Sequence, residues 1–151
     1  MKRLLLGVGN RLSRDDGVGP AVARRMVDSD WSVVDCGAAI ENAAGIVRRE
    51  RPDLLVIVDA ARMGLPPGSI RLLSVEGSDR MLASTHGLPL SFVLERVRDA
   101  ARKVLLIGVE PADLCPGEGL TAPIVQAADE LVTTLCHGDP ERIPRLPQGE
   151  V

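Results

Sequence analysis

Three short, uninterrupted apolar segments constrain the fold of this chain more than any other feature. They span residues 4–8, 54–58 and 104–109, and none of them alternates apolar with polar residues. A strand has a continuous apolar sequence when both of its faces are covered, as in a parallel sheet packed between helices. The pattern therefore predicts an α/β fold whose central strands are buried on both sides.

Two weaker patterns add strands to this sheet. Residues 31–35 are a fourth candidate, placed nearer an edge because their patterning is less apolar. Residues 69–74 alternate apolar and polar positions directly after the turn signal Pro66-Pro67-Gly68, which indicates a half-exposed and antiparallel strand. We therefore expect a mostly parallel sheet of about five strands.

Helical patterns fill the intervals between the strands. Residues 19–29 and 41–51 are helical in composition, and apolar residues repeat at helical spacing across 90–97. A last helix can begin after Thr121, whose side chain is of a type that caps helices. The order of elements is β-α-β-α-β-β-α-β-α, which favours one sheet sandwiched between helices.

The length and composition favour one domain without nucleic-acid or membrane partners. We expect a single domain over residues 1–137 and a flexible tail over 138–151, where prolines and glycines lie among charged residues. The net charge is −3 without a basic patch, and no apolar run approaches the roughly 20 residues of a membrane span. We expect a cytoplasmic monomer whose three cysteines are reduced and mostly buried.

Carboxylates follow two of the predicted strands at the same edge of the sheet. Asp15 and Asp16 lie in the loop after the first strand, and Asp59 ends the third. If the first strand lies between the second and the third, these acids meet where the strand order reverses, which is where open sheets bind ligands. The alternative for Asp15 or Asp16 is a capping role at the helix near residue 19.

One histidine can complete a metal site with these acids. His86 lies in a loop before the predicted helix at 90–97, although a lone loop histidine is more often a surface residue. Two carboxylates and an imidazole suit Ni²⁺ or Zn²⁺ better than Ca²⁺. Asp35, which ends the second strand, is a candidate supporting residue, and Glu41 and Glu110 are further acidic candidates.

Other site chemistries have less support. The chain has no G-x-S-x-G motif, and Gly7-Val8-Gly9 begins like a dinucleotide-binding loop but has Leu12 where the third glycine belongs. A phospho-acceptor receiver domain remains an alternative, with Thr85 and Lys103 as its hydroxyl and lysine, although Lys103 begins its strand instead of ending it.

Five segments in register resemble the endopeptidases that mature nickel–iron hydrogenases, especially the branch serving hydrogenase 3-type and F420-reducing enzymes. The resemblance covers roughly residues 3–135. The matching segments are LLLGVGNRLSRDDGVGP at 4–20, DCGAAIEN at 35–42, LLVIVDAARMGLPPGSIRLL at 54–73, STHGLPLSFVLE at 84–95 and VLLIGVEP at 104–111.

This resemblance implies a three-layer α/β/α fold and a specific reaction. The family, classed with aspartic-type endopeptidases, cleaves a short C-terminal peptide from the precursor of a hydrogenase large subunit after nickel insertion. Its metal ligands fall on Asp16, Asp59 and His86 here, with nickel supplied by the precursor. A nickel-dependent chaperone or regulator that does not cleave its partner is the alternative.

Overall fold

The three apolar runs form the three central strands of one sheet. They are β1 (Arg3–Val8), β3 (Leu54–Ala60) and β5 (Lys103–Val109), and each is longer than predicted by one or two residues. Every residue of β3 is buried. The computed structural model describes residues 1–85 and 89–147.

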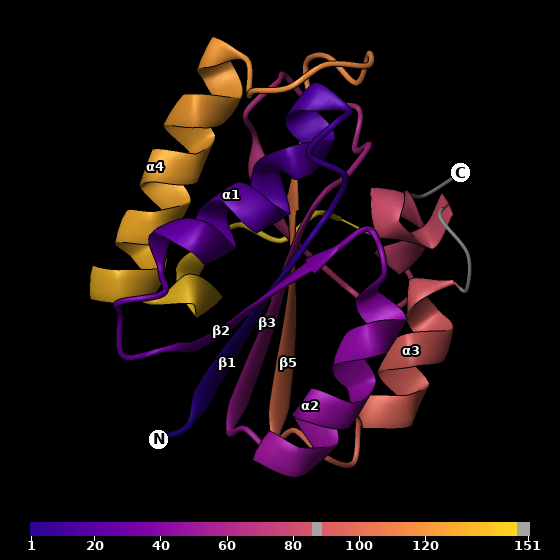
Figure 1. Ribbon diagram of the computed structural model, residues 1–151, viewed down its shortest axis with the longest axis vertical. Coiled ribbons are helices and arrows are strands. Elements are labelled where there is room, and N and C mark those ends of the chain that lie inside the picture. Colours follow the sequence, from indigo (N-terminus) through magenta and orange to yellow (C-terminus); the bar gives the residue numbers. More distant parts are fainter. Residues whose placement is uncertain (86–88, 148–151) are drawn as a thin grey trace.

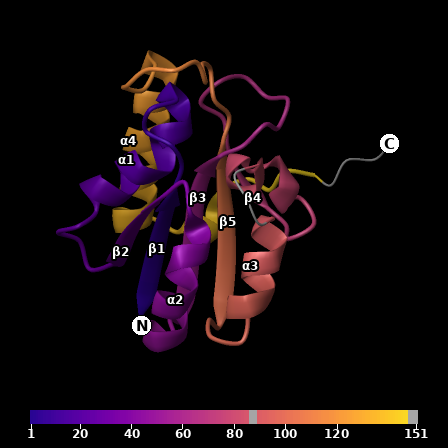
Figure 2. The same ribbon diagram turned by 45° about the vertical axis from the view of Figure 1, so that its right-hand side comes forward.

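The remaining strands lie at the two edges of the sheet. Their bounds are β2 (Ser32–Gly37) and β4 (Ile70–Leu73), and the strand order is β2-β1-β3-β5-β4. All neighbouring strands pair in parallel except β4, which pairs antiparallel with β5 (Figure 2). The predicted edge position of residues 31–35 and the predicted antiparallel strand at 69–74 are both confirmed.

Helices cover both faces of this sheet (Figure 1). On one face lie α1 (Val18–Arg25) and α4 (Ala122–His137), and on the other lie α2 (Ala44–Glu50) and α3 (Leu90–Val97). Short 3₁₀ turns connect these elements: η1 (Arg14–Gly17), η2 (Ile40–Ala43), η3 (Ser78–Arg80), η4 (Leu82–Thr85) and η5 (Pro140–Arg142). The predicted three-layer α/β/α fold is confirmed.

Alternate residues of the central strands supply two separate apolar layers. Leu4, Leu6 and Val8 of β1 pack toward α2 and α3. Leu5 of the same strand packs toward α1 and α4. Successive side chains of a strand point to opposite faces, so a strand covered on both sides must be apolar at every position. This is the physical reason that the three runs do not alternate.

Glycines allow α1 to lie directly against the strand backbones. A Cβ atom on Gly19 would stand 2.4 Å from the carbonyl oxygens of both Val8 and Val58. Gly9 has a φ of +148°, and a Cβ there would lie 1.8 Å from the carbonyl oxygen of Asp16. The glycines near the end of β1 therefore serve close backbone packing, and they bring the loop that carries Asp16 onto the sheet.

The chain beyond α4 continues along the free edge of β4. The amide of Leu72 donates to the carbonyl of Pro144 at 2.8 Å, and the amide of Leu146 donates to the carbonyl of Leu72 at 2.9 Å. Pro144 and Leu146, which fall within the range 138–151 that we expected to be a flexible tail, are thus hydrogen-bonded to an edge strand. No helix in the described part of the chain is long and apolar enough to cross a membrane.

Candidate active site

Asp16 lies in η1, directly after the loop that leaves the carboxyl end of β1. Its side chain is only 2% exposed, and its Oδ2 accepts a hydrogen bond from the amide of Asn10 at 3.1 Å. The turn is closed by the Asp16 amide, which donates to the carbonyl of Ser13 at 3.1 Å. A carboxylate is thus held inside the molecule by the short 3₁₀ turn that precedes α1.

Asp59 is the penultimate residue of β3 and is fully buried. Its Oδ2 accepts a hydrogen bond from the amide of Ala83 at 2.7 Å, whereas Oδ1 has no hydrogen-bond partner among the residues that the structure describes. Burial raises the pKa of the Asp59 carboxyl well above its usual range, and the negative charge of Asp16 raises it further. A buried carboxylate oxygen without a donor is costly and calls for a proton or a cation.

The sheet topology explains why these two acids meet. β1 lies between β2 and β3. The chain therefore adds β2 on one side of β1 and β3 on the other, and the strand order reverses between the carboxyl ends of β1 and β3. The turn η1 contacts β3, and the negative charge of Asp16 contributes to the raised pKa of Asp59. The structure therefore brings Asp16 and Asp59 together at the strand-order reversal, and their role as metal ligands stays a prediction.

The third predicted ligand, His86, lies outside the described residues. The chain that leads to it is fixed to the end of β3 at several points. Ala83 donates to Asp59, Met81 pairs with Ala61 as an antiparallel bridge, and the amide of Arg62 donates to the carbonyl of Arg80 at 2.9 Å. Within residues 1–85 and 89–147, no group of three His, Cys, Asp or Glu side chains is placed to hold a metal ion.

Asp35 lies one strand away from the two buried acids. It is exposed, and its Oδ1 accepts a hydrogen bond from the amide of Gly37 at 3.0 Å. It lines a cavity of about 490 Å³ between the carboxyl ends of β1 and β2, together with Asn10 and Arg11. Since the Asn10 amide binds Asp16, this cavity adjoins the buried pair, but the Asp35 carboxylate is not part of that pair.

Asp15 has a role that the sequence did not reveal. It does not cap α1, whose N-cap residue is Gly17 and which has no side-chain cap. The buried Asp15 carboxylate instead accepts hydrogen bonds from the amides of Ala112, Asp113 and Thr121 and from the hydroxyl of Thr121, at 2.8–2.9 Å. Thr121 is the N-cap residue of α4 as predicted, but its hydroxyl binds Asp15 and makes no cap.

Glu110 is also a buried anchor. Its Oε1 accepts hydrogen bonds from the amides of Met63 at 2.7 Å and Leu65 at 3.1 Å. These contacts fix the loop that follows β3 to the end of β5. Glu41, the other acidic candidate, is exposed between α2 and α3.

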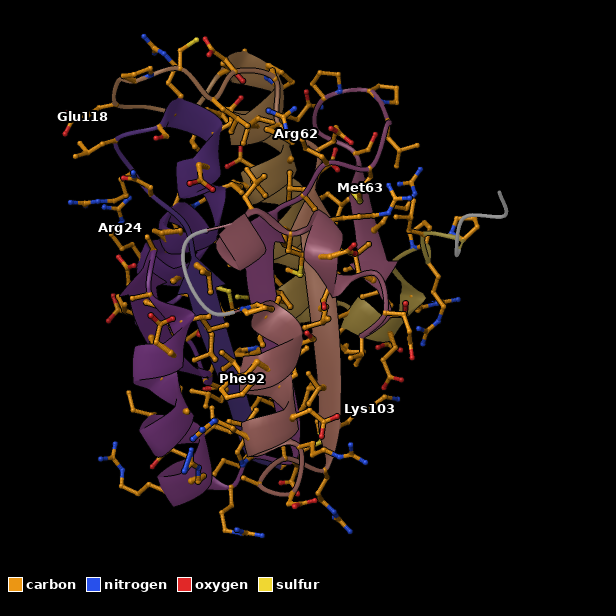
Figure 3. All side chains as sticks on the ribbon, turned by 90° about the vertical axis from the view of Figure 1, so that its right-hand side faces the viewer. Arg24, Arg62, Met63, Phe92, Lys103 and Glu118 are labelled. Carbon is orange, nitrogen blue, oxygen red and sulfur yellow. The ribbon has the colours of Figure 1, made fainter. Side chains whose placement is uncertain are left out.

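The receiver-like arrangement is not supported by the position of Lys103. This residue is at the first position of β5, paired in register with Leu54, whereas Asp59 is near the other end of β3. Figure 3 shows Lys103 at the opposite end of the molecule from Met63, which follows β3. Lys103 forms an ion pair with Glu141.

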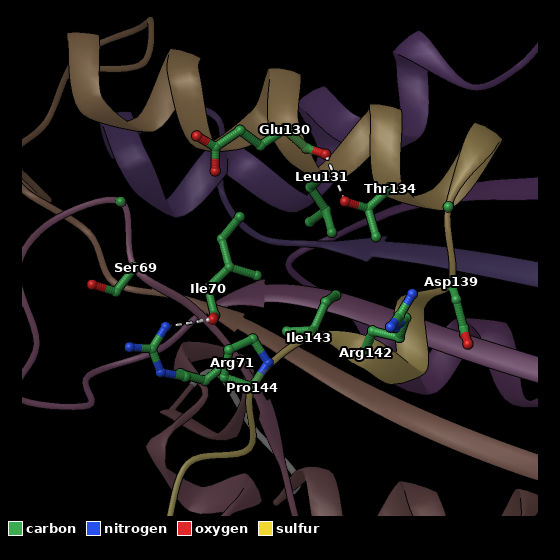
Figure 4. A pocket seen from close by; sticks show the side chains of 12 residues that line it. Ser69, Ile70, Arg71, Glu130, Leu131, Thr134, Asp139, Arg142, Ile143 and Pro144 are labelled. Atoms are coloured by element: carbon green, nitrogen blue, oxygen red, sulfur yellow. Dashed lines mark hydrogen bonds between the residues drawn. The ribbon is translucent and has the colours of Figure 1, made fainter.

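A second cavity, of about 580 Å³, lies between β4, α4 and residues 138–144 (Figure 4). Its lining includes Arg71, Glu130 and Arg142 but neither Asp16 nor Asp59. It is therefore separate from the candidate site.

Comparison with known proteins identifies the family to which this fold belongs. A family model described as hydrogenase maturation protease matches residues 18–137. The hydrogenase 3 maturation protease of Escherichia coli K12 is 33% identical over 139 residues, covering 89% of each chain. The chain belongs to the hydrogenase maturation protease family. The resemblance seen in the sequence is thereby confirmed, and the protein is a peptidase of hydrogenase maturation.

Solved structures of relatives share the whole architecture of this maturation protease. The solution structure of the endopeptidase HycI from Escherichia coli superposes with a TM-score of 0.87 at 31% identity, covering 100% of both chains. The crystal structure of a [NiFe] hydrogenase maturation protease HycI from Thermococcus kodakarensis superposes with a TM-score of 0.79 at 28% identity, covering 89% of this chain and 90% of that one.

Proposed function

We propose that this maturation protease removes a short C-terminal peptide from the nickel-loaded precursor of a nickel–iron hydrogenase large subunit. The observation that carries the proposal is the pair of buried carboxylates, Asp16 and Asp59, at the strand-order reversal. The names of the relatives, a hydrogenase 3 maturation protease and a [NiFe] hydrogenase maturation protease, supply the class of substrate.

The charge balance of this pair favours a cation that arrives with the substrate. The pKa of Asp59 is raised by its burial and by Asp16, so ionisation of both acids is electrostatically unfavourable unless a cation neutralises them. A divalent metal neutralises the two charges, and an imidazole from His86 would complete a donor set suited to Ni²⁺. In the proposal these three residues recognise the nickel that the precursor already holds.

Recognition through the substrate's metal makes cleavage conditional on nickel insertion. Three protein ligands leave coordination positions open for the ligands of the precursor, so stable association requires both the metal and its other ligands. The bound metal would polarise the scissile carbonyl, and the attacking water would be activated either by the metal or by a carboxylate. The second route corresponds to the aspartic-type classification of the family.

The cavity beside Asp16 offers a place for the precursor's tail. Its lining carries the exposed side chains of Arg11, Leu12 and Asp35, which can contact both charged and apolar groups. In the proposal Asp35 supports substrate binding and does not coordinate nickel. The proposal places the reaction in the cytoplasm.

The deciding experiment follows the mass of the precursor after incubation with the purified protease. We expect shortening of the nickel-loaded precursor and no change in the nickel-free form. Asp16→Asn, Asp59→Asn and His86→Ala should each reduce cleavage by about 100-fold or more. Asp129→Asn is the matched control, because Asp129 is an exposed residue of α4 paired with Arg25.

Three results of this experiment would contradict the proposal. Normal cleavage by all three site variants removes the assignment of the ligands. Rapid cleavage of nickel-free precursor removes the dependence on nickel. Stable binding of the nickel-loaded precursor without shortening supports the alternative, a chaperone or regulator that does not cleave.

A further inference from the structure

Asp15 and Asp16 are adjacent, buried acids with opposite environments. The Asp15 carboxylate accepts four hydrogen bonds, from three backbone amides and one hydroxyl. The Asp16 carboxylate instead accepts from the amide of Asn10, in the loop after β1. Four donors are about as many as the two oxygens of a carboxylate can accommodate. Three of these donors bind Oδ2 and one binds Oδ1, so the protein itself supplies the partners of the Asp15 carboxylate, which favours a structural role.

The donors to Asp15 come from the opposite side of the site. Ala112 and Asp113 follow β5, and Thr121 begins α4. A buried negative charge at the start of a 16-residue helix is also favoured by the helix dipole. One side chain thereby links the loop after β1 to the segment between β5 and α4.

Further contacts hold the same two segments together. Arg14 has a left-handed φ of 47°, and its amide donates to the carbonyl of Gly117 at 3.0 Å. The amide of Gly117 donates in turn to the carbonyl of Leu12 at 2.8 Å, and the Arg14 guanidinium lies 3.7 Å from Asp113 Oδ2. The strained residue before Asp15 is thus stabilised from the segment that also binds the Asp15 carboxylate.

We propose that Asp15 is a positioning residue that sets the place of Asp16 relative to Asp59. Asp16 belongs to the four-residue 3₁₀ turn η1, whose Asp15 also donates its backbone amide to the carbonyl of Asp113 at 3.1 Å. The hydrogen bonds between the Asp15 carboxylate and the segment from β5 to α4 hold this turn in place. The Asp16 carboxylate therefore stays at the end of β3. The inference rests on the proposed function, because it assigns a role in the same reaction.

Thr121 offers a test that leaves every proposed ligand in place. Thr121→Val removes the hydroxyl that binds Asp15 Oδ2 but keeps the shape and the backbone amide. Because that hydroxyl makes no cap on α4, the substitution does not remove a helix cap. We expect kcat for nickel-loaded precursor to fall roughly tenfold with little change in KM, since misplacement of a reacting group reduces rate more than binding.

Two further variants complete the series. Thr121→Ser restores a hydroxyl and should return kcat to within about twofold of the original value. Asp15→Asn replaces two acceptor oxygens by one and places an amide donor against the remaining donors, so kcat should fall roughly 100-fold. If the Asn variant does not fold, the Thr121 pair decides the question.

Leu131→Ala is the control for a general loss of stability. Leu131 is a buried core residue in the second half of α4, away from the helix start at Thr121, and its truncation should lower thermal stability at least as much as Thr121→Val. Assays are run at a temperature where circular dichroism shows every variant folded. We expect Leu131→Ala to keep its kcat.

The outcomes separate this inference from the proposed function. An unchanged kcat in Thr121→Val, a failure of Thr121→Ser to restore it, or an equal loss in Leu131→Ala overturns the positioning role while wild-type cleavage stands. Absence of cleavage by the wild-type protein overturns the proposed function and this inference with it.

Discussion

The buried carboxyl group of Asp59, at the end of β3, lies within the electrostatic influence of a second buried acid, Asp16. Burial raises the pKa of Asp59 well above its usual range, and the charge of Asp16 adds to this effect. Both side chains are 2% exposed or less. We therefore expect the burial of these two acids to lower the stability of the folded protein. Such destabilisation is common at sites that bind a cation or perform chemistry.

Replacing Asp59 by Asn should stabilise the metal-free protein at neutral pH. The raised pKa means that the folded state holds a proton that the unfolded state releases, so stability declines as pH rises from the ordinary Asp range toward the raised value. Asn removes this titration, and its side-chain oxygen can still accept the Ala83 amide. We expect Asp59→Asn to gain about 1 kcal/mol at pH 7, with the gain shrinking toward pH 4, measured by urea unfolding with a chelator.

Asp129→Asn serves as the control for this pH series, because Asp129 is an exposed partner of Arg25. Its unfolding curve should follow that of the wild-type protein across the same range. A gap between Asp59→Asn and wild type that is constant with pH would contradict the link between stability and the charge of Asp59.

Gly19→Ala should be strongly destabilising, whereas Gly45→Ala should not. A Cβ on Gly19 meets the backbones of β1 and β3 at 2.4 Å, while no atom lies within 4 Å of a Cβ on Gly45. Both glycines lie in helices. We expect a loss of about 3 kcal/mol or more for Gly19→Ala and a gain of about 0.5–1 kcal/mol for Gly45→Ala, both from chemical denaturation. Equal effects at the two positions would exclude close helix–strand packing as the reason for Gly19.

The cysteines should react with alkylating reagents at very different rates. Burial, with a contribution from Asp35, raises the pKa of Cys36 to about 12, so the thiolate that reacts is scarce at pH 8. Cys115 is exposed, although a hydrogen bond and the charge of Asp113 raise its pKa as well. We expect iodoacetamide to label Cys115 first and Cys36 only after unfolding, as mapped by peptide mass. Rapid labelling of Cys36 in the native protein would contradict its assigned environment.

Truncation after Ile143 should expose the edge of β4. The deleted residues include Pro144 and Leu146, which exchange two hydrogen bonds with Leu72. An uncovered edge strand favours association between molecules, so the melting temperature should fall by several degrees and the truncated protein should self-associate in analytical ultracentrifugation. Truncation after Pro147 keeps the pairing and should behave as the full chain, and self-association of both forms would contradict this role.

Much of the fold could be predicted because its signals are local. A short apolar run such as 54–58, bounded by turn residues, is typical of a strand covered on both faces, and the glycine- and proline-rich turn before residue 70 favours an antiparallel return. The pairing of residues 144–146 with β4 could not be predicted, because an exposed-looking, proline-containing segment carries no local signal for the strand edge that it covers.

The sequence by itself determined the residue types of the candidate site and the strand ends that carry them, since parallel strands present their carboxyl ends at one edge. Only the tertiary structure decided how the surroundings of two adjacent acids differ. Asp15 and Asp16 are chemically identical, and their difference lies in what surrounds them. Donors from Ala112, Asp113 and Thr121 bind the first, while the second lies beside Asp59. Such partners are distant in the chain, so their effect on a carboxylate exists only once the segments have packed together.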